Sequence, residues 1–126
     1  MYQKAIAKQY ENLVASLLKQ RGWSICAKNF RHIGFEIDII GSRGDQLVAF
    51  EVKYRKKFKE CFEEVEQLIP YKKWRALRRG LKFYTYLYAK KEPRLACELV
   101  IVFPTATGLK LKRFGLDQNY ASLDLD

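Results

Sequence analysis

Two apolar stretches of the chain each contain a pair of charged residues spaced two apart. The first pair is Glu36 and Asp38, and the second is Glu51 and Lys53. Alternation along a strand places residues i and i+2 on the same face, so each pair shares one face of its predicted strand. A carboxylate among apolar neighbours costs several kcal/mol unless it is paired or binds a cation. These residues are therefore candidates for chemistry.

If Asp38 and Glu51 face each other across the two strands, their oxygens form a hard anionic site suited to Mg2+ or Mn2+. Lys53 would lie beside that site, where it could orient or help deprotonate an attacking water, or stabilise charge that develops on a phosphate. The alternative is a cross-strand salt bridge, which contributes about 0.2–1 kcal/mol. The apolar setting, the E-x-K spacing and the basic segment that follows favour the metal site.

The pattern of the first half predicts a helix followed by three strands. Apolar residues at three- and four-residue spacing form a stripe over residues 6–18, and Gly22 is placed to end the helix. Alternating patterns predict strands at residues 23–29, 35–40 and 46–55, and residues 42–45 supply turn chemistry between the last two. We expect these last two strands to form a hairpin.

The second half predicts two helices and one or two further strands. A short helical piece covers residues 61–68, and a longer helix starts near Pro70. Its core-facing stripe contains Trp74, Leu77, Leu81, Tyr84 and Tyr88. Residues 95–103 form a nearly continuous apolar strand, which is typical of a strand covered on both faces.

A short last strand is expected near residues 109–114, and the tail over residues 117–126 is weakly patterned. The order αβββαβ predicts an α/β fold with a mixed β-sheet flanked by helices. A length of 126 residues fits a single domain over residues 1–126, with its core at about 7–114.

Composition excludes several classes. No apolar run approaches the roughly 20 residues of a membrane span, and the N-terminal segment lacks the pattern of a secretory signal. The three cysteines are widely spaced and there is one histidine, so no structural zinc site can be built at normal spacing. We therefore expect a cytoplasmic protein.

The net charge of +10 predicts a polyanionic partner. Residues 53–82 carry eleven Lys or Arg and four acids, a net of +7. Such a face could follow a nucleic-acid backbone without reading its sequence. A solvated surface charge is the alternative for each residue alone, and a membrane surface is less favoured because the helix also has a core-facing stripe. The candidate nucleic-acid-binding residues are Arg55, Lys56, Lys57, Lys72, Lys73, Arg75, Arg79 and Lys82.

Asp38 followed by Glu51-Val52-Lys53 resembles the signature of the PD-(D/E)XK, or restriction-endonuclease-like, nucleases. The segments YENLVASLLKQRGW, NFRHIGFEIDII and LVAFEVKYRKK, together with the helix that contains Lys72, resemble the YraN family. That family is related in fold to archaeal Holliday junction resolvases. The resemblance covers roughly Ala7 to Phe114.

The resemblance implies a restriction-endonuclease-like core and a role for each matching residue. Asp38 and Glu51 would bind Mg2+ or Mn2+, with the Val52 carbonyl as a third oxygen. Lys53 would be the catalytic lysine. Glu11 would complete the site from the first helix.

Glu36 matches the family pattern and is a candidate for a further ligand, while a solvated helix charge is the alternative for Glu11. Two positions depart from the pattern: Ile37 precedes Asp38 where the family name has proline, and Tyr10 precedes Glu11 where relatives usually have glycine. Neither departure removes a ligand.

The function expected from these residues is a divalent-metal-dependent nuclease that hydrolyses DNA phosphodiester bonds, with branched DNA as a candidate substrate. The alternative is a non-catalytic DNA- or RNA-binding module that keeps the nuclease fold. Nothing in the sequence excludes RNA as the target. Resolvase-like relatives act as homodimers, so the resemblance also implies a candidate homodimer.

Overall fold

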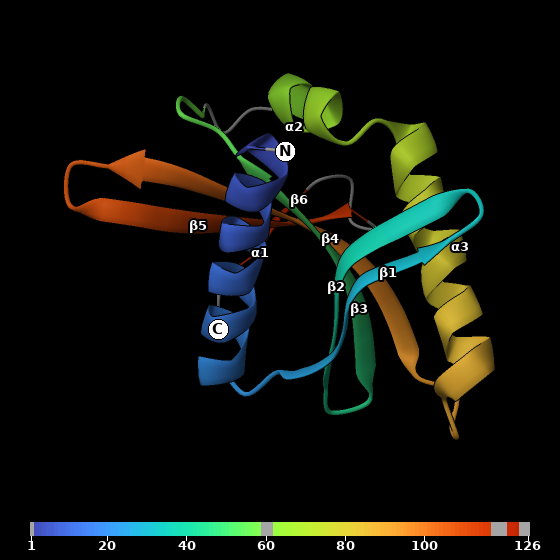
Figure 1. The fold of residues 1–126 in the computed structure, drawn as a ribbon. Helices are drawn as coiled ribbons and strands as arrows, with labels where there is room; N and C mark the ends of the chain where they lie inside the picture. Colours follow the sequence, from blue (N-terminus) through green and yellow to red (C-terminus); the bar gives the residue numbers. More distant parts are fainter. Residues whose placement is uncertain (1, 59–61, 117–120, 124–126) are drawn as a thin grey trace.

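A computed structural model describes residues 2–58, 62–116 and 121–123 of the chain. Figure 1 shows the helices and strands in chain order. They are α1 (Tyr2–Gln20), β1 (Ser24–His32), β2 (Phe35–Arg43), β3 (Gln46–Tyr54), α2 (Phe62–Leu68), α3 (Tyr71–Tyr88), β4 (Arg94–Thr105), β5 (Gly108–Gly115) and β6 (Ala121–Leu123).

The six strands form one mixed sheet in the order β1-β2-β3-β4-β5-β6. All neighbouring strands are antiparallel except β3 and β4, which are parallel and are connected through α2 and α3. Figure 1 shows α1 and α3 flanking this sheet. The predicted α/β fold, with its αβββαβ order and mixed sheet flanked by helices, is confirmed.

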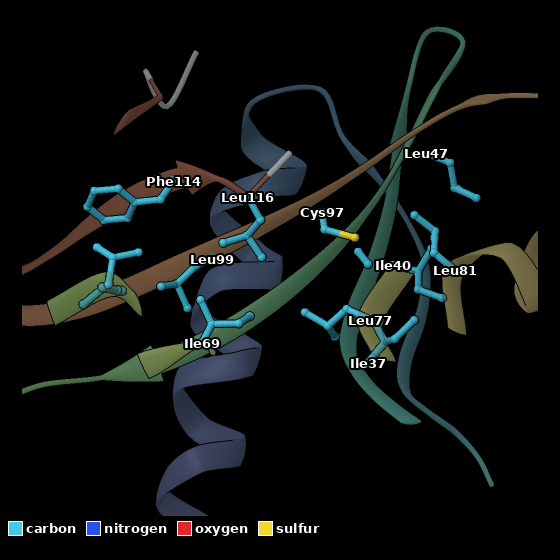
Figure 2. Close-up of a cluster of buried hydrophobic side chains, with 13 residues drawn as sticks. Ile37, Ile40, Leu47, Ile69, Leu77, Leu81, Cys97, Leu99, Phe114 and Leu116 are labelled. Carbon is cyan, nitrogen blue, oxygen red and sulfur yellow. The ribbon is translucent and has the colours of Figure 1, made fainter. Parts of the chain in front are cut away.

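Alternation along β3 divides the core into two layers. Val48, Phe50 and Val52 point to the layer under α1, where they pack with Val14 and Leu18. Leu47 and Ala49 point to the other layer, which contains α3 residues Leu77 and Leu81; Figure 2 shows this cluster. Both faces of β3 and β4 are therefore covered, and for β4 this confirms what the apolar run of residues 95–103 predicted.

The turn after α1 directs the chain into the first strand of the sheet. Gly22 has a φ of +89°, its N–H donates to the Lys19 carbonyl at 3.1 Å, and the Trp23 N–H donates to the Leu18 carbonyl at 3.0 Å. This pair of hydrogen bonds is a Schellman motif, which satisfies the last carbonyls of a helix. The prediction that Gly22 ends the first helix is confirmed, and Trp23 enters the core with its ring edge on Phe50.

The tip of the β1–β2 hairpin is held against α3. The Arg79 guanidinium donates to the Gly34 carbonyl at 3.1 Å, and the His32 and Phe83 rings lie 4.5 Å apart. Phe35 packs directly over Gly80, where a Cβ would lie 2.5 Å from the nearest ring carbon. Only glycine leaves room for this contact, so Gly80 sets how closely the hairpin and the helix approach.

Three details differ from the sequence-based expectation. β1 and β2 are longer than predicted, because only Ile33 and Gly34 are needed for their turn. Tyr88 does not join the core: it ends α3, its ring lies against Tyr84, and 62% of its surface is exposed. The weakly patterned tail contains β6, while residues 117–120 and 124–126 lie outside the described residues. Within the described part of the chain, no helix is long and apolar enough to cross a membrane.

We expect Gly80→Ala to lower the free energy of unfolding by about 1 kcal/mol in urea titrations. A mid-helix Gly→Ala change alone would stabilise the helix by about 1 kcal/mol, but the new methyl group overlaps the Phe35 ring, and overpacking costs about 1–3 kcal/mol. In a Phe35→Leu background the same change should become neutral or stabilising. A stabilising effect of Gly80→Ala in the wild-type background would contradict this packing.

Candidate active site

The site begins where β2 and β3 separate. Their pairing runs from Arg43 and Gln46 to Ile39 and Phe50, and no pair follows in the ladder. At the next position, Asp38 Oδ2 accepts a hydrogen bond from the Val52 N–H at 2.8 Å. A buried backbone donor needs a partner, and here a carboxylate takes the place of the lost strand carbonyl. Because the two strands separate here, the Asp38 side chain can interact with side chains of neighbouring elements.

Glu51 is the most deeply buried acid of the site. It is 3% exposed, and its Oε2 atom has no hydrogen-bond partner. Burial raises the pKa of Glu51 to about 8, and the hydrogen bond and negative charge of Asp38 act in the same direction. The ammonium groups of Lys73 and Lys53 oppose this shift. Lys73 Nζ lies 3.3 Å from Glu51 Oε2, within ion-pair distance.

Glu11 approaches the same place from α1. One of its carboxylate oxygens is buried without a hydrogen-bond partner. Its pKa is raised by burial first, and then by the negative charges of Asp38 and Glu36. Lys28 and a hydrogen bond from Asn29 act against this rise. Helix α1, strand β2 and strand β3 therefore each contribute one carboxylate to a shared electrostatic environment.

Asn29 is a site residue that the sequence analysis did not single out. Its φ of +53° makes it the single positive-φ residue other than glycine within the described ranges. It falls between the pairs Lys28–Ile39 and Phe30–Ile37, which places it opposite Asp38. Asparagine tolerates this backbone conformation better than most residues, and its side chain hydrogen-bonds Glu11. The sequence offered one signal for this residue, which is that an asparagine ends the alternating pattern of the predicted strand.

The remaining predicted site residues surround these carboxylates. Glu36 is paired with Arg31, with 3.2 Å between the guanidinium and the carboxylate. Lys53 is half-buried and lines a pocket of about 560 Å3 together with Tyr10, Tyr54 and Arg55. Val52 gives its N–H to Asp38, and the ligand role of its carbonyl stays a prediction.

The donor set fits a hard divalent cation. Glu11 and Glu51 each keep a buried oxygen without a hydrogen-bond partner, and carboxylate oxygens are the ligands that Mg2+ and Mn2+ prefer. Among the described side chains, however, no three His, Cys, Asp or Glu residues are grouped tightly enough to hold a metal ion as they stand. The metal-binding roles of Glu11, Asp38, Glu51 and Glu36 therefore stay predictions.

The predicted nucleic-acid-binding residues divide into two groups. Four of them have partners within the chain: Lys73 pairs with Glu51, Arg79 bonds Gly34, the Arg75 guanidinium lies over the Tyr71 ring at 5.7 Å, and the Arg55 guanidinium donates to the Tyr54 carbonyl at 2.7 Å. The others are exposed on the segment after β3 and on α3. These are Lys56, Lys57, Lys72 and Lys82.

An αβββαβ core that brings acids of the first helix and of two strands together, with a lysine two residues after the last acid, defines a restriction-endonuclease-like protein. The chain belongs to the uncharacterised protein family UPF0102, whose model matches residues 10–114. This is the YraN branch of the PD-(D/E)XK-like proteins, so the resemblance stated from the sequence is confirmed.

Three UPF0102 proteins illustrate the similarity. The chain is 33% identical over 98 residues to one from Coxiella burnetii, which covers 76% of this chain and 78% of the relative. It is 34% identical over 88 residues to one from Thermodesulfovibrio yellowstonii, an alignment that covers 70% of this chain and 77% of the relative. It is 28% identical over 86 residues to one from Carboxydothermus hydrogenoformans, where the alignment covers 68% of this chain and 71% of the relative. These names give a family and no reaction, so a function has to come from the site itself.

Two equally buried glutamates allow a matched test of the site. Glu51 has an oxygen without a hydrogen-bond partner, whereas Glu98 receives two hydrogen bonds from Arg113 at 2.7 and 2.8 Å. Both residues are 3% exposed. In EDTA at pH 8, we expect Glu51→Gln to raise the free energy of unfolding by about 1–3 kcal/mol. Glu98→Gln should lower it by about 3 kcal/mol, because it removes the charged partner of the bidentate bond from the buried Arg113 guanidinium.

The stabilisation that we expect from Glu51→Gln should change with pH in one direction. Folding raises the pKa of Glu51 from 4.5 to about 8, so between these values the folded carboxyl holds a proton that the unfolded one has lost. Wild-type stability should therefore fall as pH rises through this window, and the advantage of Glu51→Gln should grow with it. Urea titrations at pH 5, 6.5 and 8 would measure this. A stabilisation that is constant with pH, or a loss of stability, would contradict it.

Proposed function

We propose that this protein is a divalent-metal-dependent nuclease that hydrolyses phosphodiester bonds of DNA, with branched DNA as the candidate substrate. The observation that carries the proposal is the buried, incompletely satisfied Glu51 carboxylate beside a second carboxylate, Asp38. Such a pair lowers the stability of an empty fold, since like charges and burial both disfavour ionisation. A cation bound between them would remove that cost.

In this proposal Glu11, Asp38 and Glu51 hold Mg2+ or Mn2+, with Glu36 and the Val52 carbonyl as further candidate ligands. A bound ion supplies Lewis-acid stabilisation of the phosphate and lowers the pKa of a water molecule. The Lys53 ammonium group is close enough to Glu51 to lower the pKa of that carboxyl group. From there its ammonium group would orient the attacking water or balance negative charge on the phosphate.

The exposed cations after β3 and on α3 would hold the nucleic acid over this site. Contacts of Lys or Arg with phosphates position a duplex but do not read its bases. This suits an enzyme that selects the shape of its substrate rather than its sequence. The preference for DNA over RNA rests on the resemblance to resolvases, as does the predicted homodimer, and both are proposals.

One observation favours a second candidate, a nucleic-acid-binding module without turnover. Within residues 2–58, 62–116 and 121–123, the acids do not form a ready-made group of three metal ligands. A protein of this kind would use the basic surface to bind nucleic acid and would take up no metal.

The decisive experiment incubates the protein with linear, flapped and four-way-junction DNA, and with a matched RNA, in Mg2+ or Mn2+. We expect cleavage of DNA by the wild-type protein and a loss of at least about 100-fold in Asp38→Asn, comparable to removal of one catalytic electrostatic group. Asparagine keeps an oxygen that can accept the Val52 N–H, so the strands stay in place.

Asp45→Asn provides a matched control, because Asp45 is an exposed acid that pairs with Arg94 away from the site. It should cleave like the wild type. Calorimetric titration with Mn2+ completes the test, with binding expected for the wild type and Asp45→Asn but not for Asp38→Asn. Metal-free DNA binding without cleavage would establish the binding module instead, and cleavage that survives Asp38→Asn would refute the assigned site.

A further inference from the structure

A pocket of about 630 Å3 adjoins the carboxylates on the α1 side of the sheet, away from the basic residues of α3. We call it the α1 pocket. We propose that the α1 pocket binds a backbone phosphate of the nucleic acid next to the one that is cleaved. This inference rests on the proposed function and adds a second phosphate-binding surface to it. The pocket is lined by Lys4, Ala5, Ala7, Lys8, Glu11, Asn29, Arg31 and Glu36.

The charges of α1 are arranged for an anion rather than for helix stability. Lys4 and Lys8 are exposed, and their spacing of four residues places them on the same helix face. A like-charged pair at this spacing destabilises a helix, and cations near a helix N-terminus also oppose the helix dipole. The first turn contains no acid that could compensate. A phosphate between these lysines would relieve both effects.

The opposite wall of the α1 pocket adds a third cation. Arg31 of β1 lies there and is paired with Glu36 at 3.2 Å, with both side chains partly exposed. An arginine can bind a phosphate through two parallel N–H groups. Cations from two separate elements therefore border the pocket, while Glu11 links it to the carboxylate site.

The lining residues favour recognition of the backbone over recognition of bases. None of the described side chains that border the α1 pocket is aromatic, so these residues offer bases no ring to stack on. The small Ala5 and Ala7 leave the helix surface open to a sugar-phosphate chain. A phosphate held here would therefore contribute affinity that does not depend on sequence.

A second pocket, which contains Lys53, shares a lining residue with the α1 pocket. Ala7 lines both this pocket and the one formed by Lys53 and Arg55. Figure 1 shows the N-terminal end of α1 at the end of the sheet where β3 leads to α2. A single strand laid across this end would pass from Arg55 over the carboxylates to Lys4 and Lys8, with cations on both sides of the cleaved bond.

The test compares two double variants that remove the same charge. Lys4→Ala/Lys8→Ala alters the α1 pocket, and Lys90→Ala/Lys91→Ala alters the exposed segment beyond the other end of α3. Fluorescence anisotropy with a labelled single-stranded DNA would be recorded in EDTA, so that no cleavage occurs, over a series of salt concentrations. Loss of the one phosphate held between these lysines should reduce the slope of log K against log salt by about 0.7 for a single strand.

We expect the Lys4→Ala/Lys8→Ala variant to bind at least about 10-fold more weakly than the Lys90→Ala/Lys91→Ala variant at low salt. The loss should be equal for oligo(dT) and oligo(dA), and Lys4→Arg/Lys8→Arg should restore binding. Circular dichroism would check that α1 stays folded, as expected for exposed lysines. Equal affinities and slopes for the two alanine variants would overturn the proposal.

This outcome can be separated from that of the proposed function. If the wild type binds DNA and the α1 variant shows the expected loss, the phosphate site stands even when no variant cleaves DNA in Mg2+ or Mn2+. If the wild type cleaves DNA while the α1 variant binds and cleaves like the control variant, the nuclease stands and the phosphate site is refuted.

Discussion

The arrangement of the site depends on one hydrogen bond, from the Val52 N–H to the Asp38 carboxylate. A strand that loses its neighbour leaves buried backbone donors unsatisfied, which costs about as much as a lost hydrogen bond. Asp38 meets this requirement with a side chain, so β2 can turn away while β3 continues beside β4. At the opening that results, the Asp38 carboxylate raises the pKa of both Glu51 and Glu11.

The two helices around this opening also determine its electrostatics. Because α1 and α3 cover both faces of β3, an acid on that strand lies in a nearly dry environment. Glu98 on the neighbouring strand is equally buried, but a bidentate bond with Arg113 satisfies its carboxylate. Among the described residues, one buried acid is therefore satisfied by a bidentate bond, whereas the Oε2 atom of Glu51 has no hydrogen-bond partner and only the Lys73 ammonium at ion-pair distance. This difference in satisfaction sets Glu51 apart from a structural acid of equal burial.

Much of this could be predicted from the sequence, because it depends on local patterns. Alternation correctly predicted strands β1, β2 and β3, and Pro70 and Gly22 marked helix ends. What could not be predicted depends on contacts between distant segments. The approach of Lys73 to Glu51 is set by the packing of α3 on the sheet, and the conformation of Asn29 by its position opposite Asp38. Tyr88 fits the helical period, but the core does not extend that far.

The position of the first helix has a practical consequence for purified material. Helix α1 begins at Tyr2, and Lys4, two residues later, already borders the pocket beside the carboxylates. At a rise of about 1.5 Å per residue, any peptide fused ahead of Tyr2 emerges at the mouth of the site. A polyhistidine affinity tag there would bring metal-chelating imidazoles to the end of the helix on which Glu11 lies, about 14 Å from it along the axis. Such a tag has to be removed before metal uptake is attributed to the protein's own carboxylates.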